Sequence, residues 1–186
     1  MMEKSKPYDM LVDFVTGNQV PNVGAEEVRQ QVERLLVEAK GYDKEDIEVD
    51  APLELTIGDK PIRSNVDLVV SVSGKRFMVL KCVPGSLGSR HRETLAAARL
   101  LEVYQIPFSV VTDGNNAELL DTVTGEMIHS GMEAIPSRED AMTRLKRLKL
   151  EPFPHEKLER EKIIFRAYDE MNVNVQRKLK PTEAEP

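Results

Sequence analysis

The sequence predicts an α/β protein built on a mixed β-sheet. Residues 77–83 and 107–112 are apolar almost throughout and rich in Val, a pattern typical of strands that are buried on both faces. Residues 90–105, which lie between them, carry apolar side chains at helical spacing. A helix that connects two such strands crosses over the sheet, so the two strands are expected to be parallel. Residues 65–72 are expected to pair antiparallel with residues 77–83 through a turn at Gly74, which makes the sheet mixed.

The N-terminal part predicts one helix and further extended segments. Residues 8–15 fit either a short strand or a helical turn. Residues 25–40 are expected to form a helix that Gly41 ends as a C-cap. One face of this helix is apolar, formed by Val28, Val32, Leu35, Leu36 and Ala39. Residues 47–49 and 53–57 alternate between apolar and polar side chains and are expected to be extended.

The C-terminal part predicts helices of a different character. Residues 118–122 read as the last strand of the sheet. Ser137 resembles a helix N-cap with an acidic residue, Asp140, three positions later. After a break at residues 152–154, a second helix is expected from His155 to about Met171.

These segments suggest a division into a core and its extensions. We expect an N-terminal extension over residues 1–24, a core domain over residues 25–130, a helical appendage over residues 131–171 and a disordered tail over residues 172–186. Cys82 is the sole cysteine, and neither a signal sequence nor a long apolar run is apparent, so a cytoplasmic protein without membrane segments is expected.

One charged residue interrupts the buried strand at residues 77–83. Lys81 is surrounded in sequence by apolar residues, and lysine is seldom buried without a partner. The preceding strand also carries a single charge, Asp67, and a hairpin turn at Gly74 would place the two residues opposite each other. A carboxylate and an ammonium group in an otherwise apolar hairpin indicate a functional site. The alternatives are a purely structural ion pair, or a lysine at a sheet edge that extends to water.

The charge distribution places this hairpin in a basic part of an acidic chain. The net charge is −6, yet between residues 60 and 99 the only acids are Asp67 and Glu93. Such a segment suits a polyanion such as DNA, although a solvated charged surface would show the same pattern. The candidate nucleic-acid contacts are Arg63, Lys75, Arg76, Arg90 and Arg92. The sequence contains neither a nucleotide-binding glycine motif nor a zinc-ligand spacing.

A set of residues spread over positions 24–128 resembles a known family. It consists of Glu26-Glu27-Val28-Arg29-Gln30, Gly41-Tyr42, Ile47-Glu48-Val49, Arg63, Asp67, Lys81, Tyr104 and Thr112-Asp113-Gly114. In order and spacing they resemble the N-terminal domain of the type I restriction enzyme R subunit. That domain has a restriction-endonuclease-like fold of the PD-(D/E)XK nuclease superfamily.

The resemblance implies a Mg²⁺-dependent nuclease site acting on DNA. It makes Asp67 a metal ligand, Lys81 the catalytic lysine, and Glu26 or Glu27 a further metal contact, with Glu26 favoured by its spacing to Arg29. The chain departs from the family pattern at Val79, where an acidic residue is expected two positions before the lysine.

Relatives of the superfamily can supply a missing carboxylate from the following helix, which makes Glu93 a candidate catalytic residue and metal ligand, unless it only faces solvent near the start of that helix. Two functions therefore stay open. They are an active Mg²⁺-dependent endonuclease, and a catalytically degenerate module that binds nucleic acid or a protein partner.

Overall fold

The structure contains the mixed sheet that the sequence predicts. The computed structural model describes the backbone of residues 8–179 and the side chains of residues 8–171. Six strands pair in the order β3-β4-β5-β6-β7-β8, and only β5 and β6 are parallel. Their bounds are β3 Ile47–Ile57, β4 Lys60–Val72, β5 Lys75–Cys82, β6 Phe108–Thr112, β7 Ala117–Asp121 and β8 Met127–Ser130. The α/β fold class is confirmed.

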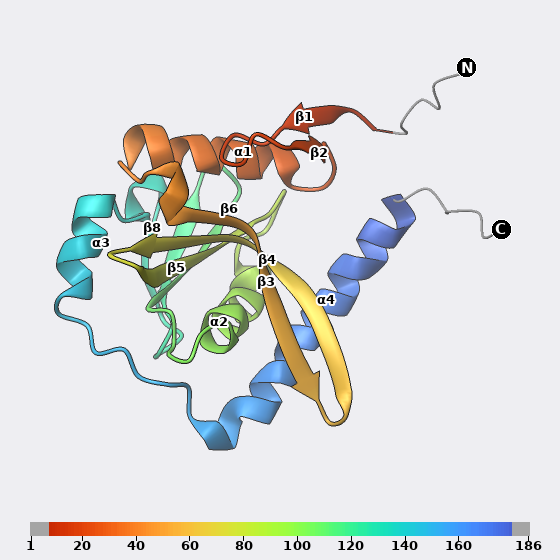
Figure 1. Cartoon of the computed structure of the whole chain (residues 1–186), viewed down its shortest axis with the longest axis vertical. Coiled ribbons are helices and arrows are strands. Elements are labelled where there is room, and N and C mark those ends of the chain that lie inside the picture. The colour runs from red at the N-terminus through yellow and green to blue at the C-terminus, as the bar shows by residue number, and fades with distance from the viewer. Residues whose placement is uncertain (1–7, 180–186) are drawn as a thin grey trace.

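Helices cover both faces of the sheet (Figure 1). On one face, α1 (Glu26–Arg34), its π-helical continuation (Leu35–Ala39) and α3 (Arg138–Leu145) pack against the central strands. On the other face lies α2 (His91–Leu100), whose Ala96, Ala97 and Ala98 are buried against Val69 and Val79. The small alanine side chains allow α2 to approach the sheet closely, which matters for the position of every polar residue on its first turn.

A long C-terminal helix, α4 (Leu158–Leu179), packs beside α2 and along the hairpin of β3 and β4 (Figure 1). Lys162 donates a hydrogen bond to the Thr56 carbonyl at 3.1 Å, and Ser64 donates one to Asp169. Phe165 is buried between these elements. The helical appendage therefore contributes directly to the hydrophobic core on the α2 face.

Several elements differ in extent from the prediction. Of the two alternatives for residues 8–15, the structure shows the strand, β1 (Met10–Val12), paired with β2 (Gln19–Pro21). The segments expected at residues 47–49 and 53–57 form one strand, interrupted only where Asp50 adopts a positive φ of 52°. α2 ends at Leu100 rather than at Gln105, because the chain turns there to bring Ile106 into the core before Pro107.

The C-terminal helices begin where the sequence indicates. Ser137 caps α3 by accepting a hydrogen bond from the backbone N–H of Asp140, as predicted. The expected second helix starts with a 3-10 turn at His155–Lys157, but α4 continues to Leu179 instead of ending near Met171. The rest of the expected tail, residues 180–186, lies outside the described residues. No helix in the described part of the chain has the length and apolar character needed to cross a membrane.

Short 3-10 helices complete the described chain. They lie at Lys44–Asp46, Gly88–Arg90 and Met132–Ala134. The turn at Gly88–Arg90 lies in the connection from the end of β5 to the start of α2. It therefore sets where the first turn of α2 lies relative to Lys81.

Candidate active site

The hairpin of β4 and β5 brings Asp67 and Lys81 together at the point where its backbone pairing ends. The last paired residues of the ladder are Leu68 and Leu80. One position further, the Asp67 carboxylate takes the place of a backbone acceptor and receives a hydrogen bond from the Cys82 N–H at 2.9 Å. The hairpin turn at Gly74, where φ is 70°, pairs Val72 with Lys75, and a register shift between Val70 and Ser71 moves the pairing on by one residue. Without that shift Asp67 would lie opposite Leu80, so the shift is what places Asp67 opposite Lys81.

Lys81 contacts two carboxylates. Its Nζ lies 3.2 Å from Oδ1 of Asp67 and 3.3 Å from Oε1 of Glu93. The Lys81 side chain is only 20% exposed, and that of Glu93 only 6%. The structure thus joins residues from β4, β5 and α2 into one cluster, which we call the carboxylate–lysine site (Asp67, Lys81 and Glu93).

Packing of α2 explains why Glu93 points inward rather than toward solvent. The alanine face of α2 rests on the sheet, and Glu93 lies on the same side, one turn nearer the start of the helix. Arg90 adds a second contact, with its Nη1 3.0 Å from Oε2 of Glu93. Both oxygens of this buried carboxylate therefore face a cation.

The charges in the site keep Lys81 protonated. Burial alone would lower the pKa of Lys81, but the adjacent carboxylates of Asp67 and Glu93 raise it above its usual value. Cys82 behaves in the opposite way, because burial raises the pKa of its thiol well above the usual value. The protonated forms of the Cys82 thiol and the Lys81 ammonium group are thus both favoured.

A small hollow lies at the carboxylate–lysine site. Its volume is about 10 Å³, which is close to what one water molecule or one cation requires. Apolar side chains close it on two sides, namely Val79 of β5 and Phe165 of α4. Carboxylate oxygens are the hard ligands that Mg²⁺ prefers, and one or two carboxylates are usual for that ion. The donor set of Asp67 and Glu93 therefore fits Mg²⁺, although the described residues contain no group of three or more acidic, His or Cys side chains that could hold a metal ion.

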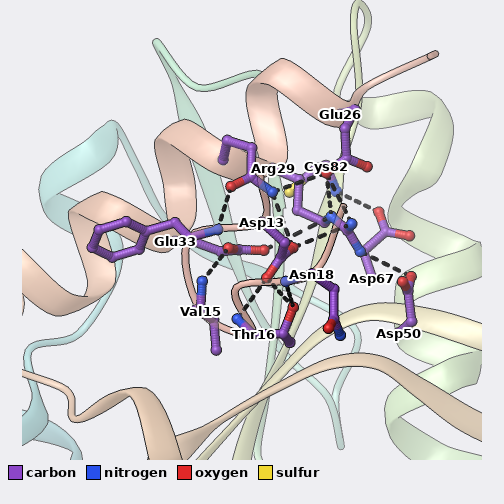
Figure 2. Close-up of polar contacts among 12 residues, drawn as sticks. Asp13, Val15, Thr16, Asn18, Glu26, Arg29, Glu33, Asp50, Asp67 and Cys82 are labelled. Atoms are coloured by element: carbon purple, nitrogen blue, oxygen red, sulfur yellow. Dashed lines mark hydrogen bonds and ion pairs between the residues drawn. The ribbon is translucent and has the colours of Figure 1, made fainter. Parts of the chain in front are cut away.

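Glu26, the predicted third metal contact, belongs to a different polar cluster on α1. Its Oε1 accepts hydrogen bonds from Arg29 Nη2 at 2.8 Å and from Gln30 Nε2 at 2.9 Å. Figure 2 shows Arg29 in the middle of this cluster, with Asp67 and Cys82 next to it. The other helix candidate, Glu27, accepts a hydrogen bond from Asn22. The structure thus gives the Glu26 carboxylate partners on its own helix.

The predicted nucleic-acid contacts are distributed over distant parts of the molecule. Arg90 lies at the site through its contact with Glu93. Arg63, four positions before Asp67 on β4, is 84% exposed and pairs with Glu54. Lys75 and Arg76 begin β5, roughly 15–20 Å along the strand from Lys81. Their DNA contacts stay predictions.

Ion pairs also neutralise much of the basic segment. Arg76 pairs with Glu48 at 2.8 Å and lies 3.7 Å from Glu102, both outside residues 60–99. Arg92 pairs with Glu161 of α4 at 3.3 Å. The excess of positive charge along the sequence is thus largely balanced in space by acids from other elements.

Two features of the site region are absent from the sequence-based set. Phe165 lines the hollow from a helix that is distant in sequence, and no local pattern connects it to Asp67. His91, at the start of α2, contacts Glu118 of β7, two strands from Lys81 on the same face of the sheet. Because β7 carries both Glu118 and Asp121, Glu118 does not stand out in the sequence as a lone charge in an apolar strand, as Lys81 does.

The fold and the carboxylate–lysine site define a class of protein, a mixed-sheet α/β domain whose charged site lies between a hairpin and a crossover helix. A family model described as type I restriction enzyme R protein N terminus (HSDR_N) matches residues 24–136. The chain therefore belongs to this family, as the resemblance indicates. Comparisons with curated proteins and with solved structures gave no match.

Proposed function

We propose that this domain is a Mg²⁺-dependent nuclease that hydrolyses phosphodiester bonds in DNA, as expected for a PD-(D/E)XK enzyme. The observation that carries the proposal is the placement of Lys81 between two carboxylates, 3.2 Å from Asp67 and 3.3 Å from Glu93. A structural ion pair needs one carboxylate, whereas a second buried carboxylate adds a desolvation cost that function would explain. Membership in the restriction-subunit family supports DNA as the substrate class.

The proposed roles follow from the chemistry of each group. Asp67 and Glu93 would hold Mg²⁺, which would supply an activated water and neutralise charge on the phosphate. Lys81 remains an ammonium group and would orient the attacking water or stabilise the negative charge that develops on the phosphate oxygens. The partly buried Arg90–Glu93 contact would fix the orientation of the Glu93 carboxylate before substrate arrives.

Glu93 would compensate for the missing acidic residue at position 79. Val79 is almost completely buried and packs against the alanine face of α2. An acidic side chain there would face that apolar contact, while Glu93 reaches Lys81 from the helix itself. The carboxylate would thus have moved from β5 to α2 without leaving the site.

Cleavage assays on purified variants test this function. Plasmid and single-stranded DNA incubated with Mg²⁺ or Mn²⁺ should be cleaved by the wild type. Lys81→Ala, Asp67→Asn and Glu93→Gln should each lower the rate by about 100-fold or more, because the first removes a cation that stabilises developing charge and the other two remove a proposed metal ligand. Lys149→Ala is the matched control, since Lys149 is 87% exposed and pairs with Glu151 at the surface.

The outcomes separate the roles. Cleavage that persists unchanged in Lys81→Ala would come from a contaminant and would remove the assignment. Cleavage that depends on Asp67 and Lys81 but not on Glu93 would leave the domain active without the proposed carboxylate from α2. Circular dichroism of each variant controls for loss of fold.

A second function rests on Val79 and on the internal charge balance of the site. Within the described residues, the negative charges of Asp67 and Glu93 are matched by the positive charges of Lys81 and Arg90, which balances these four side chains without a metal. A catalytically degenerate module with this site would bind nucleic acid or a protein partner in the cytoplasm without cleaving DNA. It predicts DNA binding that weakens with salt and does not require a divalent metal.

A further inference from the structure

A large hollow lies outside the carboxylate–lysine site, between α2 and the start of α4. Its volume is about 600 Å³, within the range of small-molecule sites in proteins. Four cations line it, namely Arg92 and Arg99 from α2, Lys157 from the 3-10 turn before α4, and Arg160 from the first turn of α4. We call this hollow the basic groove.

One acidic residue lines the groove, and it is already paired. Glu161 is 4% exposed and lies 2.9 Å from Arg99 and 3.3 Å from Arg92. These ion pairs fix the positions of the Arg92 and Arg99 guanidinium groups in the groove lining. Within the part of the chain whose side chains are described, Lys157 and Arg160 form no ion pair. The lining thus carries an excess of positive charge that is open to an anionic ligand.

The groove also contains an aromatic ring. Phe153 lies beneath the guanidinium of Arg99, with 5.4 Å between the Arg99 Cζ and the ring centroid. Pro154, Ile164 and Val123 extend this apolar lining. Phosphates prefer cations, whereas nucleobases stack on aromatic rings and on guanidinium planes, so the two halves of the lining suit the two halves of a nucleotide.

We propose that the basic groove binds a segment of single-stranded DNA, with its phosphates on Lys157, Arg160 and Arg92 and a base against Phe153. A duplex would offer the phosphates but would keep its base faces stacked inside, so the aromatic part of the groove favours a single strand. Arg92 is next to Glu93 in the sequence, and the groove and the carboxylate–lysine site share helix α2. The inference rests on the proposed nuclease function for its biological meaning, because it makes the groove a second binding region for the substrate.

Fluorescence anisotropy of a labelled oligothymidylate in EDTA tests the groove without any need for cleavage. The double variant Lys157→Ala/Arg160→Ala should weaken binding by about 10-fold or more at low salt. It should also reduce the slope of log K against log salt by about 0.7 for each phosphate that the protein no longer neutralises. Phe153→Leu should weaken binding by about 5- to 100-fold with the slope unchanged, because it removes stacking but no charge.

The matched control removes the same charge elsewhere. Lys146 and Arg147 are exposed after α3 and do not line the groove, so Lys146→Ala/Arg147→Ala should bind like the wild type. The proposal would be overturned if the control variant lost as much affinity for the oligothymidylate as the groove variants do. It would also be overturned if the groove variants lost affinity for duplex DNA and for single-stranded DNA to the same extent. Groove-dependent binding by a protein that cleaves no DNA would support the groove while rejecting the nuclease function. If the wild type cleaves DNA but the groove variants bind the oligothymidylate as tightly as the wild type does, the nuclease function is supported and the basic groove is rejected as a DNA-binding site.

Discussion

At the residue scale, the most unusual group outside the candidate site is Glu33 of α1. Its side chain is fully buried, and its Oε1 is the buried polar side-chain atom without a hydrogen bond among the described residues. Burial and the neighbouring charge of Asp13 raise its pKa from 4.5 to about 7. Burial would also raise the pKa of Asp13, but hydrogen bonds from Thr16 and Gln30 lower it instead, so Asp13 is the ionised partner.

This raised pKa predicts a specific dependence of stability on pH. Between pH 4.5 and about 7 the folded state keeps the Glu33 proton while the unfolded state has lost it, so the free energy of unfolding falls as pH rises. The loss amounts to about 3 kcal/mol in total and is complete above the folded pKa. The stabilising contribution of Asp13 is lost only below this range, because its folded pKa is lowered.

Glu33→Gln should remove this dependence. The amide can donate to Asp13 as the protonated carboxyl does, and it does not ionise. Urea unfolding at several pH values measures the free energy of unfolding. Between pH 5 and pH 8 the difference between the variant and the wild type should shift by up to about 3 kcal/mol in favour of the variant. Glu38→Gln, at an exposed position of the following π-helical turn, is the control and should follow the wild type. If the free energy of unfolding changes with pH in the same way for the wild type and Glu33→Gln, the pKa of Glu33 is not raised in the folded protein.

At the scale of elements, α4 is held against α2 by a buried ion-pair network as well as by Phe165. Arg99 donates hydrogen bonds to Glu161 and to the Thr122 carbonyl, and its side chain is only 9% exposed. Glu161→Ala would leave this guanidinium buried with its carboxylate partner missing. The first turns of α4 thus depend on one acidic residue on their inner face.

Glu161→Ala should therefore lower the free energy of unfolding by about 3 kcal/mol, the usual cost of breaking a buried ion pair by removing one partner. Glu159→Ala removes an acid from the same helix, but Glu159 is 64% exposed and pairs with Lys162 at the surface, so its loss should cost less than about 1 kcal/mol. Urea denaturation measures both values. Equal effects would mean that the network contributes no more than a surface pair.

At the scale of the whole molecule, the sequence predicts those features that short-range patterns encode. The apolar strands and the crossover helix are sufficient for the α/β class, and the turn at Gly74 brings Asp67 and Lys81 onto neighbouring strands. Their exact pairing also depends on the register shift between Val70 and Ser71, which the turn does not encode. The inward direction of Glu93 depends on the rotation of α2 about its axis, which its alanine contacts with the sheet determine. The packing of α4 and the basic groove involve residues far apart in sequence, and local periodicity carries no information about such contacts.

Metal binding at the carboxylate–lysine site should affect the stability of the entire fold. A ligand that binds only the folded state stabilises it by about 2.7 kcal/mol at 100 times its dissociation constant, which corresponds to a rise of roughly 5–10 °C in melting temperature for a chain of this size.

Lys81 competes for the same carboxylates, since its Nζ lies within 3.3 Å of both. Lys81→Met should therefore increase the rise in melting temperature that Mn²⁺ causes, while it should abolish the proposed cleavage. Asp67→Asn should lose that rise, and calorimetric titration of Mn²⁺ should show the same order of affinities. If Mn²⁺ leaves the melting temperature of all three proteins unchanged, the cluster is a neutral structural site, and the degenerate binding module becomes the better description of the domain.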